Sequence, residues 1–284
     1  MHICKGLDLK NQNLYKILRK DLTHYDFTYK LGENIDILPF NPSGSCECGG
    51  LYFTDEDHIA EFIHYGELIA TINLDPNEIV YIERERDKYK VHKLYINKIE
   101  TLDEFINNLS NICCVKLVKQ NGLALEYVKN QTDKICLEAV KQNGLALKYV
   151  KNQTYEICSE AIRQNSSSIC HVKNQTEELC LKSVKINGLN ILDVHNQTRK
   201  ICLESVSQDG TALEYIDNQT EEICLEAVKQ NGSALQYVLI QTEKICIEAI
   251  NESSEALKYV KNWTNQIRSE AINKYHESAF DYIK

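Results

Sequence analysis

Apolar residues recur with a helical period over residues 110–284, in a unit that repeats every 22 residues. In one unit Ile135, Cys136, Ala139 and Val140 occupy positions i, i+1, i+4 and i+5, which places them on one face of a helix. This unit reads TDKICLEAVKQNGLALKYVKNQ from Thr132. Copies begin at Ser110, Thr132, Thr154, Thr176, Thr198, Thr220, Thr242 and Thr264. The pattern predicts eight units, the last with one extra residue near Tyr275.

Each unit carries the signals of two short helices. Thr132 is a good N-cap for the first helix, without the glutamate of a capping box. Asn143-Gly144 is expected to end that helix with a residue in the left-handed region. A second short helix follows, with Ala146 and Leu147 inward. Helices this short are stable only when they stack on neighbours, so the pattern predicts an α-solenoid.

Residues 1–108 lack the repeat and read as a small α+β domain. A helix is expected over 8–23 and a second one from Thr54 or Asp55 to Gly66. LYFT, ELIATINL, EIVYIERE and KVHKLYI are rich in β-branched and aromatic residues, which predicts strands. TLDEFINNL reads as a linking helix. The predicted organisation is therefore an α+β domain at 1–108 and an all-α repeat solenoid at 109–284.

The charge balance limits the partners. With 32 basic and 41 acidic residues the net charge is −9, which argues against nucleic-acid binding. No apolar run is long enough for a membrane span, and the first residues lack the apolar core of a signal peptide. The protein is therefore expected in the cytoplasm of its cell, without membrane contact.

Seven cysteines share the repeat interval, which favours free thiols over a disulfide framework. They are Cys114, Cys136, Cys158, Cys180, Cys202, Cys224 and Cys246. We expect each to be a small buried hydrophobe, and Arg268, which replaces the cysteine in the last unit, to face solvent. Cys46 and Cys48, with Cys4 and His2, are a weak zinc alternative, so no metal is predicted.

Tyrosines form a second ladder, which has two interpretations. Their rings pack between layers, or they form an aromatic strip that binds a partner. The candidate partner-binding residues are Tyr127, Tyr149, Tyr215, Tyr237 and Tyr259. His171 and Asp193 interrupt the ladder. Positions just after each cap also vary, for example Asp133/Lys134 and Arg199/Lys200.

Two resemblances add to this picture. The repeat, with N-Q-T, E-I-C-x-E-A and N-G-x-A-L-x-Y-V-K, closely resembles repeats of unknown function in mimivirus-type giant viruses. Residues Tyr29–Gly32, Pro39–Pro42 and Gly49–Thr54 resemble an N-terminal module of proteins from the same viruses. The resemblance implies a viral protein that acts in an infected cell or forms part of the virion.

Gly50-Leu51-Tyr52-Phe53-Thr54, followed by a helical segment, resembles the middle element of ADP-ribosyltransferases. This implies that Tyr52 stacks on the nicotinamide of NAD and that Glu78, Glu83 or Glu85 is the catalytic glutamate. The first element departs from that family, because Tyr29-Lys30-Leu31-Gly32 lacks the expected His-Gly or Arg.

These observations lead to a non-enzymatic adaptor that binds a host or viral protein along the solenoid, with no cofactor. One alternative is a mono-ADP-ribosyltransferase-like head that the repeats direct to its targets, with NAD as cofactor. Another is a self-associating virion or assembly component. The sequence leaves the oligomeric state open.

Overall fold

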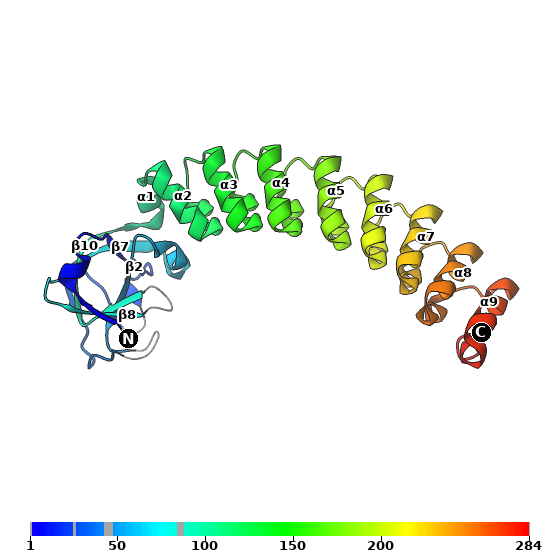
Figure 1. The fold of residues 1–284 in the computed structure, drawn as a ribbon, viewed down its shortest axis with the longest axis horizontal. Helices are drawn as coiled ribbons and strands as arrows, with labels where there is room; N and C mark the ends of the chain where they lie inside the picture. Colours follow the sequence, from blue (N-terminus) through cyan, green and yellow to red (C-terminus); the bar gives the residue numbers. More distant parts are fainter. Residues whose placement is uncertain (1, 25–26, 43–47, 84–87, 284) are drawn as a thin grey trace. The chain divides into compact units, whose positions relative to one another are not determined.

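The computed structural model describes residues 2–24, 27–42, 48–83 and 88–283. The chain divides into two compact units, 1–151 and 152–284. The first unit contains the strands, the helix α1 and two repeats, and the second unit contains repeats only (Figure 1). We call residues 1–108 the head and residues 109–284 the array. The head–array boundary at 108/109 remains a prediction, since it falls inside the first compact unit.

The head is built on an eight-stranded antiparallel sheet with the order β1-β8-β9-β6-β2-β7-β10-β5. Its strands are β1 (His2–Lys5), β2 (Leu14–Leu18), β5 (Gly32–Ile35), β6 (Leu51–Asp55), β7 (Leu68–Asn73), β8 (Ile79–Glu83), β9 (Lys88–Val91) and β10 (Lys93–Thr101). A two-stranded ribbon joins β3 (Thr23–His24) to β4 (Phe27–Thr28). Three short 3-10 helices complete the head, η1 (Gly6–Leu9), η2 (Ile59–Glu61) and η3 (Ile63–Tyr65).

Alternation along the strands creates the core of the head. Leu14 and Leu18 of β2, Leu51 and Phe53 of β6 and Ile72 of β7 are buried in one cluster. The side chains at the alternate positions of each strand point to the other face of the sheet. There Tyr15 meets Phe105 of α1, with ring centroids 5.0 Å apart in an edge-on arrangement. The helix α1 is therefore held on this face of the sheet by side-chain packing.

The structure corrects two of the predicted elements. The helix expected over 8–23 is wrong, because Leu14–Leu18 forms strand β2, paired with β7 and buried at all five positions. The helix expected up to Gly66 is a pair of 3-10 turns. Asp55 initiates them, since its Oδ1 accepts hydrogen bonds from the backbone N–H groups of Asp57 at 3.1 Å and His58 at 3.0 Å.

The remaining head elements agree with the prediction. LYFT, ELIATINL and EIVYIERE contain β6, β7 and β8, and KVHKLYI is divided between β9 and β10. The linking helix is α1 (Leu102–Asn107). Thr101 and Glu104 form its capping box. A β-rich head followed by helical repeats is therefore confirmed.

Eight repeats follow, and each pairs one α-helix with one 3-10 helix. The first unit holds α2 (Asn111–Gln120), η4 (Gly122–Tyr127), α3 (Asp133–Gln142) and η5 (Gly144–Tyr149). The second holds α4 (Tyr155–Gln164), η6 (Ser166–His171), α5 (Glu177–Ile186), η7 (Gly188–Asp193), α6 (Arg199–Gln208), η8 (Gly210–Tyr215), α7 (Glu221–Gln230), η9 (Gly232–Tyr237), α8 (Glu243–Glu252), η10 (Ser254–Tyr259), α9 (Asn265–Tyr275) and η11 (His276–Ala279). The second helix of each pair is thus shorter and tighter than an α-helix.

The caps and the buried face of the repeat are confirmed. Thr132 accepts a hydrogen bond from the backbone N–H of Ile135 at 3.3 Å, and the later cap threonines make the same bond. Ile135, Ala139 and Val140 are fully buried, and Cys136 is 3% exposed. One side of each α-helix therefore forms the core of its repeat.

The glycine after the α-helix has a different role from the one predicted. Asn143 lies in the extended region and caps the 3-10 helix, because its side chain accepts from the backbone N–H of Leu145. The described glycines with positive φ are Gly32, Gly49 and Gly50, all in the head. At Gly210 a Cβ would lie 2.4 Å from the carbonyl oxygen of Ala227 in the next repeat. Glycine is needed there for close approach between repeats, not for a left-handed turn.

Candidate functional site

A glutamine at the end of six repeats is hydrogen-bonded to the backbone of the following repeat. In the first unit, Gln131 Nε2 donates to the carbonyl of Tyr149 at 3.0 Å, and Gln131 Oε1 accepts from the N–H of Lys151 at 3.0 Å. In the second unit, Gln153, Gln175, Gln197, Gln219 and Gln241 make the same pair of bonds. The glutamine of N-Q-T is therefore a structural residue.

The ladder cysteines are confirmed as small buried side chains. Cys224 is 3% exposed, and its thiol points to Gln219 Oε1 at 3.8 Å. Burial, with a smaller contribution from Glu221, raises the pKa of Cys224 to about 11. The described cysteines are free thiols. A neutral, enclosed thiol of this kind is neither a nucleophile nor a metal ligand.

The ladder changes near both ends of the array. Trp263 replaces the glutamine at the end of the seventh repeat and Arg268 replaces the cysteine in the eighth, and Arg268 Nε donates to the carbonyl of Trp263 at 3.4 Å. Arg268 is half-buried, so it faces solvent less fully than predicted. At the first repeat, Asn107 of α1 takes the role of the glutamine and accepts from the N–H of Lys129 at 2.9 Å.

The candidate partner-binding tyrosines all end a 3-10 helix. Tyr127, Tyr149, Tyr215, Tyr237 and Tyr259 are half-buried. Partial burial and the nearby Glu214 raise the pKa of Tyr237, with smaller effects from Tyr215 and Tyr259. The hydroxyl of Tyr237 therefore stays protonated at physiological pH. Both earlier interpretations are compatible with this arrangement, and a binding role remains a prediction.

The solvent-facing sides of both helix types vary between repeats. We call the exposed side of the 3-10 helices the 3-10 face. At two of its positions the pairs are Leu123/Glu126, Leu145/Lys148, Ser167/Cys170, Leu189/Leu192, Thr211/Glu214, Ser233/Gln236 and Glu255/Lys258. We call the solvent-facing side of the α-helices the α face. A half-buried Leu/Glu pair recurs there at Leu137/Glu138, Leu203/Glu204 and Leu225/Glu226, and other repeats carry other pairs, such as Ser159/Glu160 and Leu181/Lys182.

Some of the variable residues after each cap form contacts between neighbouring repeats. Arg199 forms a bidentate ion pair with Glu222 of the next repeat, with Nε–Oε2 at 2.8 Å and Nη2–Oε1 at 2.5 Å. The Tyr155 hydroxyl is hydrogen-bonded to Glu178. These exposed positions therefore link neighbouring repeats. The 3-10 face varies as well, and sequence reasoning had reached it only through its tyrosines.

In the head, Tyr52 and Glu83 lie on strands that are separated by β9. Tyr52 of β6 pairs with Lys90 of β9, and Lys88 of β9 pairs with Glu83 of β8, so the four side chains share one face of the sheet. The Tyr52 ring is 7% exposed, with the Lys90 ammonium 4.7 Å from its centroid. Glu85 lies outside the described residues. The transferase assignment of these residues remains a prediction.

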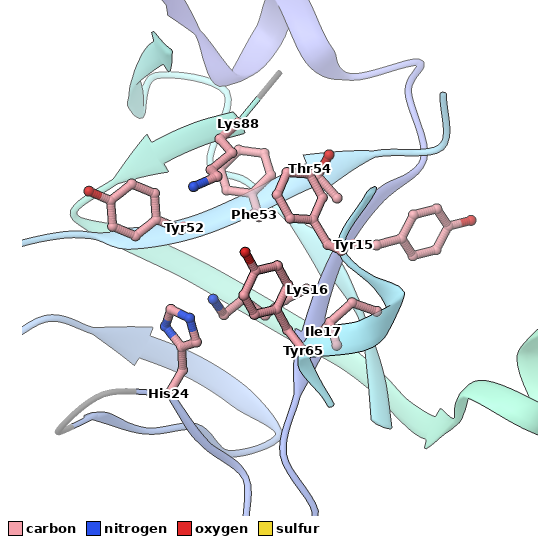
Figure 2. A pocket seen from close by; sticks show the side chains of 10 residues that line it. Tyr15, Lys16, Ile17, His24, Tyr52, Phe53, Thr54, Tyr65 and Lys88 are labelled. Carbon is pink, nitrogen blue, oxygen red and sulfur yellow. The ribbon is translucent and has the colours of Figure 1, made fainter. Parts of the chain in front are cut away.

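Tyr52 also lines a small cavity of about 70 Å³, which opens where β2 and β6 separate. The two strands pair only at Leu14–Asp55 and Tyr15–Thr54. Beyond these two pairs, Lys16 and Ile17 of β2 pair only with β7, whereas Tyr52 and Phe53 of β6 pair with β9. The two strands therefore diverge. Figure 2 shows Lys16 from β2 and Lys88 from β9 ending in the same space, beside Tyr52, Tyr65 and His24.

His24 is a neutral member of the cavity lining. Burial and the positive charges of Lys16, Arg19 and Lys88 lower the pKa of His24 to about 3. His24 is therefore neutral at physiological pH. Lys16 and Lys88 are only 5% and 8% exposed. Sequence reasoning had identified Tyr52 but missed both lysines.

The described residues contain no candidate metal site and no candidate membrane-spanning helix. Within the described ranges, no group of three His, Cys, Asp or Glu side chains is placed to hold a metal ion. Cys46 and the side chain of His2, both named for the zinc alternative, lie outside the description. Among the described helices, none has the length and apolar character needed to span a bilayer.

Comparisons with known proteins agree with the repeat. Similar curated proteins come from Acanthamoeba polyphaga mimivirus. "Putative ankyrin repeat protein R229" is 45% identical over 60 residues, 20% of this chain and 20% of that protein. "Putative ankyrin repeat protein R896" is 42% identical over 62 residues, 22% of this chain and 19% of that protein. The matches thus span about a fifth of each relative's length. No solved structure matches the chain.

The repeat nevertheless differs from an ankyrin unit. Ankyrin repeats have 33 residues with two α-helices, whereas this unit has 22 residues with one α-helix and one 3-10 helix. A family model described as "Domain of unknown function (DUF4116)" matches residues 113–153, 132–175, 176–220, 198–241 and 220–268. These ranges together cover more than half of the chain and confirm its resemblance to giant-virus repeats of unknown function. The chain belongs to the family of Domain of unknown function (DUF4116) proteins.

Proposed function

We propose that the array is a non-enzymatic binding surface for a host or viral protein, and that the partner contacts the 3-10 face. The observation that carries this proposal is the contrast between a constant framework and a varied surface. Gln219 and Cys224 recur in both neighbouring repeats because they hold the repeats together. The 3-10 face varies in charge and size from one repeat to the next.

The chemistry of that face suits protein recognition. Tyrosine supplies a large contact area with few rotatable bonds and is enriched among residues that dominate binding energy. Leu189 and Leu192 are 38% and 63% exposed, and they lie in the repeat where Asp193 interrupts the tyrosine ladder. This face therefore offers apolar and aromatic groups in a different order along each part of the array.

The relatives support a repeat-based role without defining a partner. Those proteins carry "ankyrin repeat" in their names, and repeat proteins use extended surfaces to bind other proteins. We infer that this chain acts in the cytoplasm of an infected cell or in the virion. The net charge of −9 supports a protein partner over a nucleic acid.

Site-specific photo-crosslinking tests the proposal with the intact chain. A photoreactive amino acid at position 192 or 237 on the 3-10 face is expected to crosslink one defined protein in infected-cell lysate. The matched control places it at Glu226 on the α face, where we expect no such product. Equal labelling from both faces, or no specific product from either, would contradict the proposal.

The transferase alternative has a separate test. If the head uses NAD, labelled NAD should modify the protein itself or lysate proteins, and Tyr52→Ala should abolish the signal. Absence of labelling at high NAD concentration would eliminate this alternative. A self-associating component would instead crosslink to a second copy of the chain in the photo-crosslinking experiment.

A further inference from the structure

Exposed leucines lie on the 3-10 side of the fourth repeat (176–197) and the sixth repeat (220–241). Leu189 and Leu192 of η7 are 38% and 63% exposed, and Leu239, two residues after η9, is 68% exposed. Leu189 and Leu192 are three residues apart, so they lie on the same side of a 3-10 helix. The 3-10 helices pack on one another in succession, with η8 between η7 and η9. The fifth repeat alone therefore separates the two apolar positions.

The fifth repeat (198–219) differs from the others in charge. Its exposed residues at the end of η8 include Glu214 and Asp217. Among the first seven repeats, it is the one with a carboxylate at both positions. The corresponding pairs in the other six are Glu126/Lys129, Lys148/Lys151, Cys170/Lys173, Leu192/His195, Gln236/Leu239 and Lys258/Lys261. Neither Glu214 nor Asp217 is ion-paired with a described residue of the second unit.

We propose that the partner of the array contacts the fourth to sixth repeats through a basic residue that lies between apolar side chains. This inference rests on the proposed function and defines the chemistry of the partner. The basic group lies at Glu214 and Asp217, and the apolar groups cover Leu189 and Leu192 on one side and Leu239 on the other. We call these five residues the leucine–acid surface.

The leucines supply the affinity, because covering exposed apolar side chains releases water. The fold of the repeat does not require them. At the positions of Leu189 and Leu192 the sixth repeat carries Ser233 and Gln236. The core of the fourth repeat even accepts the polar Asn190, 5% exposed, at a position that most repeats fill with alanine. This repeat therefore presents apolar side chains to solvent where its own packing has no use for them.

The carboxylates select the charge of the partner. An ion pair at the edge of an apolar contact excludes like-charged partners and accelerates association with a basic one. Partial burial and the nearby Glu214 raise the pKa of Tyr237, so a carboxylate and a tyrosine of the next repeat lie together. Arginine can pair with a carboxylate and also stack on an aromatic ring. The surface therefore favours arginine over lysine as the central basic residue.

The spacing of the repeats sets the length of the partner segment. Packed helices lie about 8–10 Å apart, so three successive 3-10 helices span about 16–20 Å. An extended chain covers this distance with about 5–6 residues, and an α-helix with about 11–13 residues. A peptide of about 16 residues is therefore long enough in either conformation.

A library of random peptides of this length, displayed on phage, tests the inference with the full chain. The library is first depleted on the double variant Leu189→Ser/Leu192→Gln, whose new side chains occur at the same positions of the sixth repeat. Peptides that bind only the parent protein are expected to combine Leu, Ile, Phe or Trp with Arg or Lys. An empty selection, or selected peptides without a basic residue, would overturn the proposal.

Affinities of a selected synthetic peptide, measured by fluorescence anisotropy, locate its binding. The double variant should bind it at least tenfold more weakly, as expected for residues at the centre of an interface. Glu214→Gln should weaken it about two- to fivefold and reduce the dependence on salt. The matched control is Glu126→Gln, at the same position of the first repeat, which should leave the affinity unchanged. Equal losses in Glu214→Gln and Glu126→Gln would overturn the proposal.

The protein found by photo-crosslinking separates this inference from the proposed function. If that protein loses affinity for Tyr237→Ala but binds Leu189→Ser/Leu192→Gln and Glu214→Gln like the parent, the leucine–acid surface is wrong and the 3-10 face remains the binding face. Urea denaturation of each variant should give an unfolding free energy close to that of the parent. Weaker binding by a variant that is folded and equally stable then reports the lost contact.

Discussion

The side-chain amide of Gln219 donates a hydrogen bond to the backbone carbonyl of Tyr237 at 3.0 Å, one repeat further along the chain. The same glutamine accepts from the backbone N–H of Leu239 at 3.0 Å. Tyr237 ends a 3-10 helix, so this glutamine fixes the backbone that presents a surface tyrosine. The repeat framework and the candidate binding face thus meet at one residue.

Gln219→Leu should destabilise the protein, because it leaves the carbonyl of Tyr237 and the N–H of Leu239 without their inter-repeat partner. We expect a loss of about 1–2 kcal/mol, because two partly exposed hydrogen bonds are lost and each contributes about 0.5–1.5 kcal/mol. Urea denaturation measures the loss, and hydrogen exchange should increase first near residues 237–239.

The matched control for that variant is Asn218→Ala, the exposed neighbour of Gln219 in N-Q-T. It should change the free energy of unfolding by less than about 0.5 kcal/mol, as surface substitutions usually do. If Asn218→Ala and Gln219→Leu cost the same, the glutamine ladder is not what couples the repeats.

Two buried serines should respond to alanine with opposite signs. Ser168 Oγ is fully buried and, within the described part of the chain, lacks a hydrogen-bond partner, so Ser168→Ala should stabilise by about 1 kcal/mol. Ser205 Oγ donates to the carbonyl of Gly188 at 2.8 Å, so Ser205→Ala should destabilise by about 1 kcal/mol. Thermal and urea unfolding check both, and equal signs would contradict this assignment.

Gly232 should not tolerate a side chain. A Cβ at this position would lie 2.6 Å from the carbonyl oxygen of Ala249 in the next repeat. Gly232→Ala should therefore cost about 1–3 kcal/mol by forcing the repeats apart. Ser233→Ala, one residue away on the 3-10 face, is the control and should be nearly neutral. A neutral Gly232→Ala would show that the repeats separate freely.

The buried thiols should make the array sensitive to alkaline pH. The ordinary cysteine pKa is 9.0, and burial raises that of Cys224 to about 11 in the folded state. Between these values the unfolded state has lost the proton that the folded state keeps, so stability should fall as pH rises from 9 to 11. Cys224→Ala should make this decline less steep in urea titrations across that range, and an unchanged slope would contradict the assignment.

The same burial predicts slow thiol chemistry in the folded protein. At pH 8, Cys224 should react with a thiol reagent far more slowly than Cys48, which is exposed. Mass spectrometry of the labelled peptides measures both sites in one sample. Comparable labelling of the two cysteines would mean that the repeats open readily.

The array was predictable from sequence because its constraints are local and repeated. Thr132, Ile135 and Cys136 recur at fixed spacing, so the helix predicted in one copy is supported by the same pattern in the other copies. The glycine after the α-helix was misinterpreted for a physical reason. Asn-Gly has a strong local preference for a turn, whereas at Gly210 the reason for glycine is a carbonyl of the next repeat, a contact that local patterns do not show.

The head was harder to predict because its contacts are distant in sequence. Leu14, Tyr15, Ile17 and Leu18 have a helix-like spacing, yet the five residues of β2 are buried between β6 and β7. The cavity depends on Lys16 and Lys88, which only the sheet register brings together. Lys16 within the apolar segment LYKIL was a signal in the sequence that could have pointed to the cavity. The sequence pattern did not show which strands would be its neighbours.

The most direct test of the central claim is the affinity of the full chain for its crosslinked partner, measured with both proteins purified. Tyr237→Ala and Leu192→Ala on the 3-10 face should each weaken the complex at least tenfold, with unfolding free energies close to that of the parent protein. Glu226→Ala on the α face should leave the affinity unchanged. The reverse pattern, with affinity lost only in the α-face variant, would contradict the account.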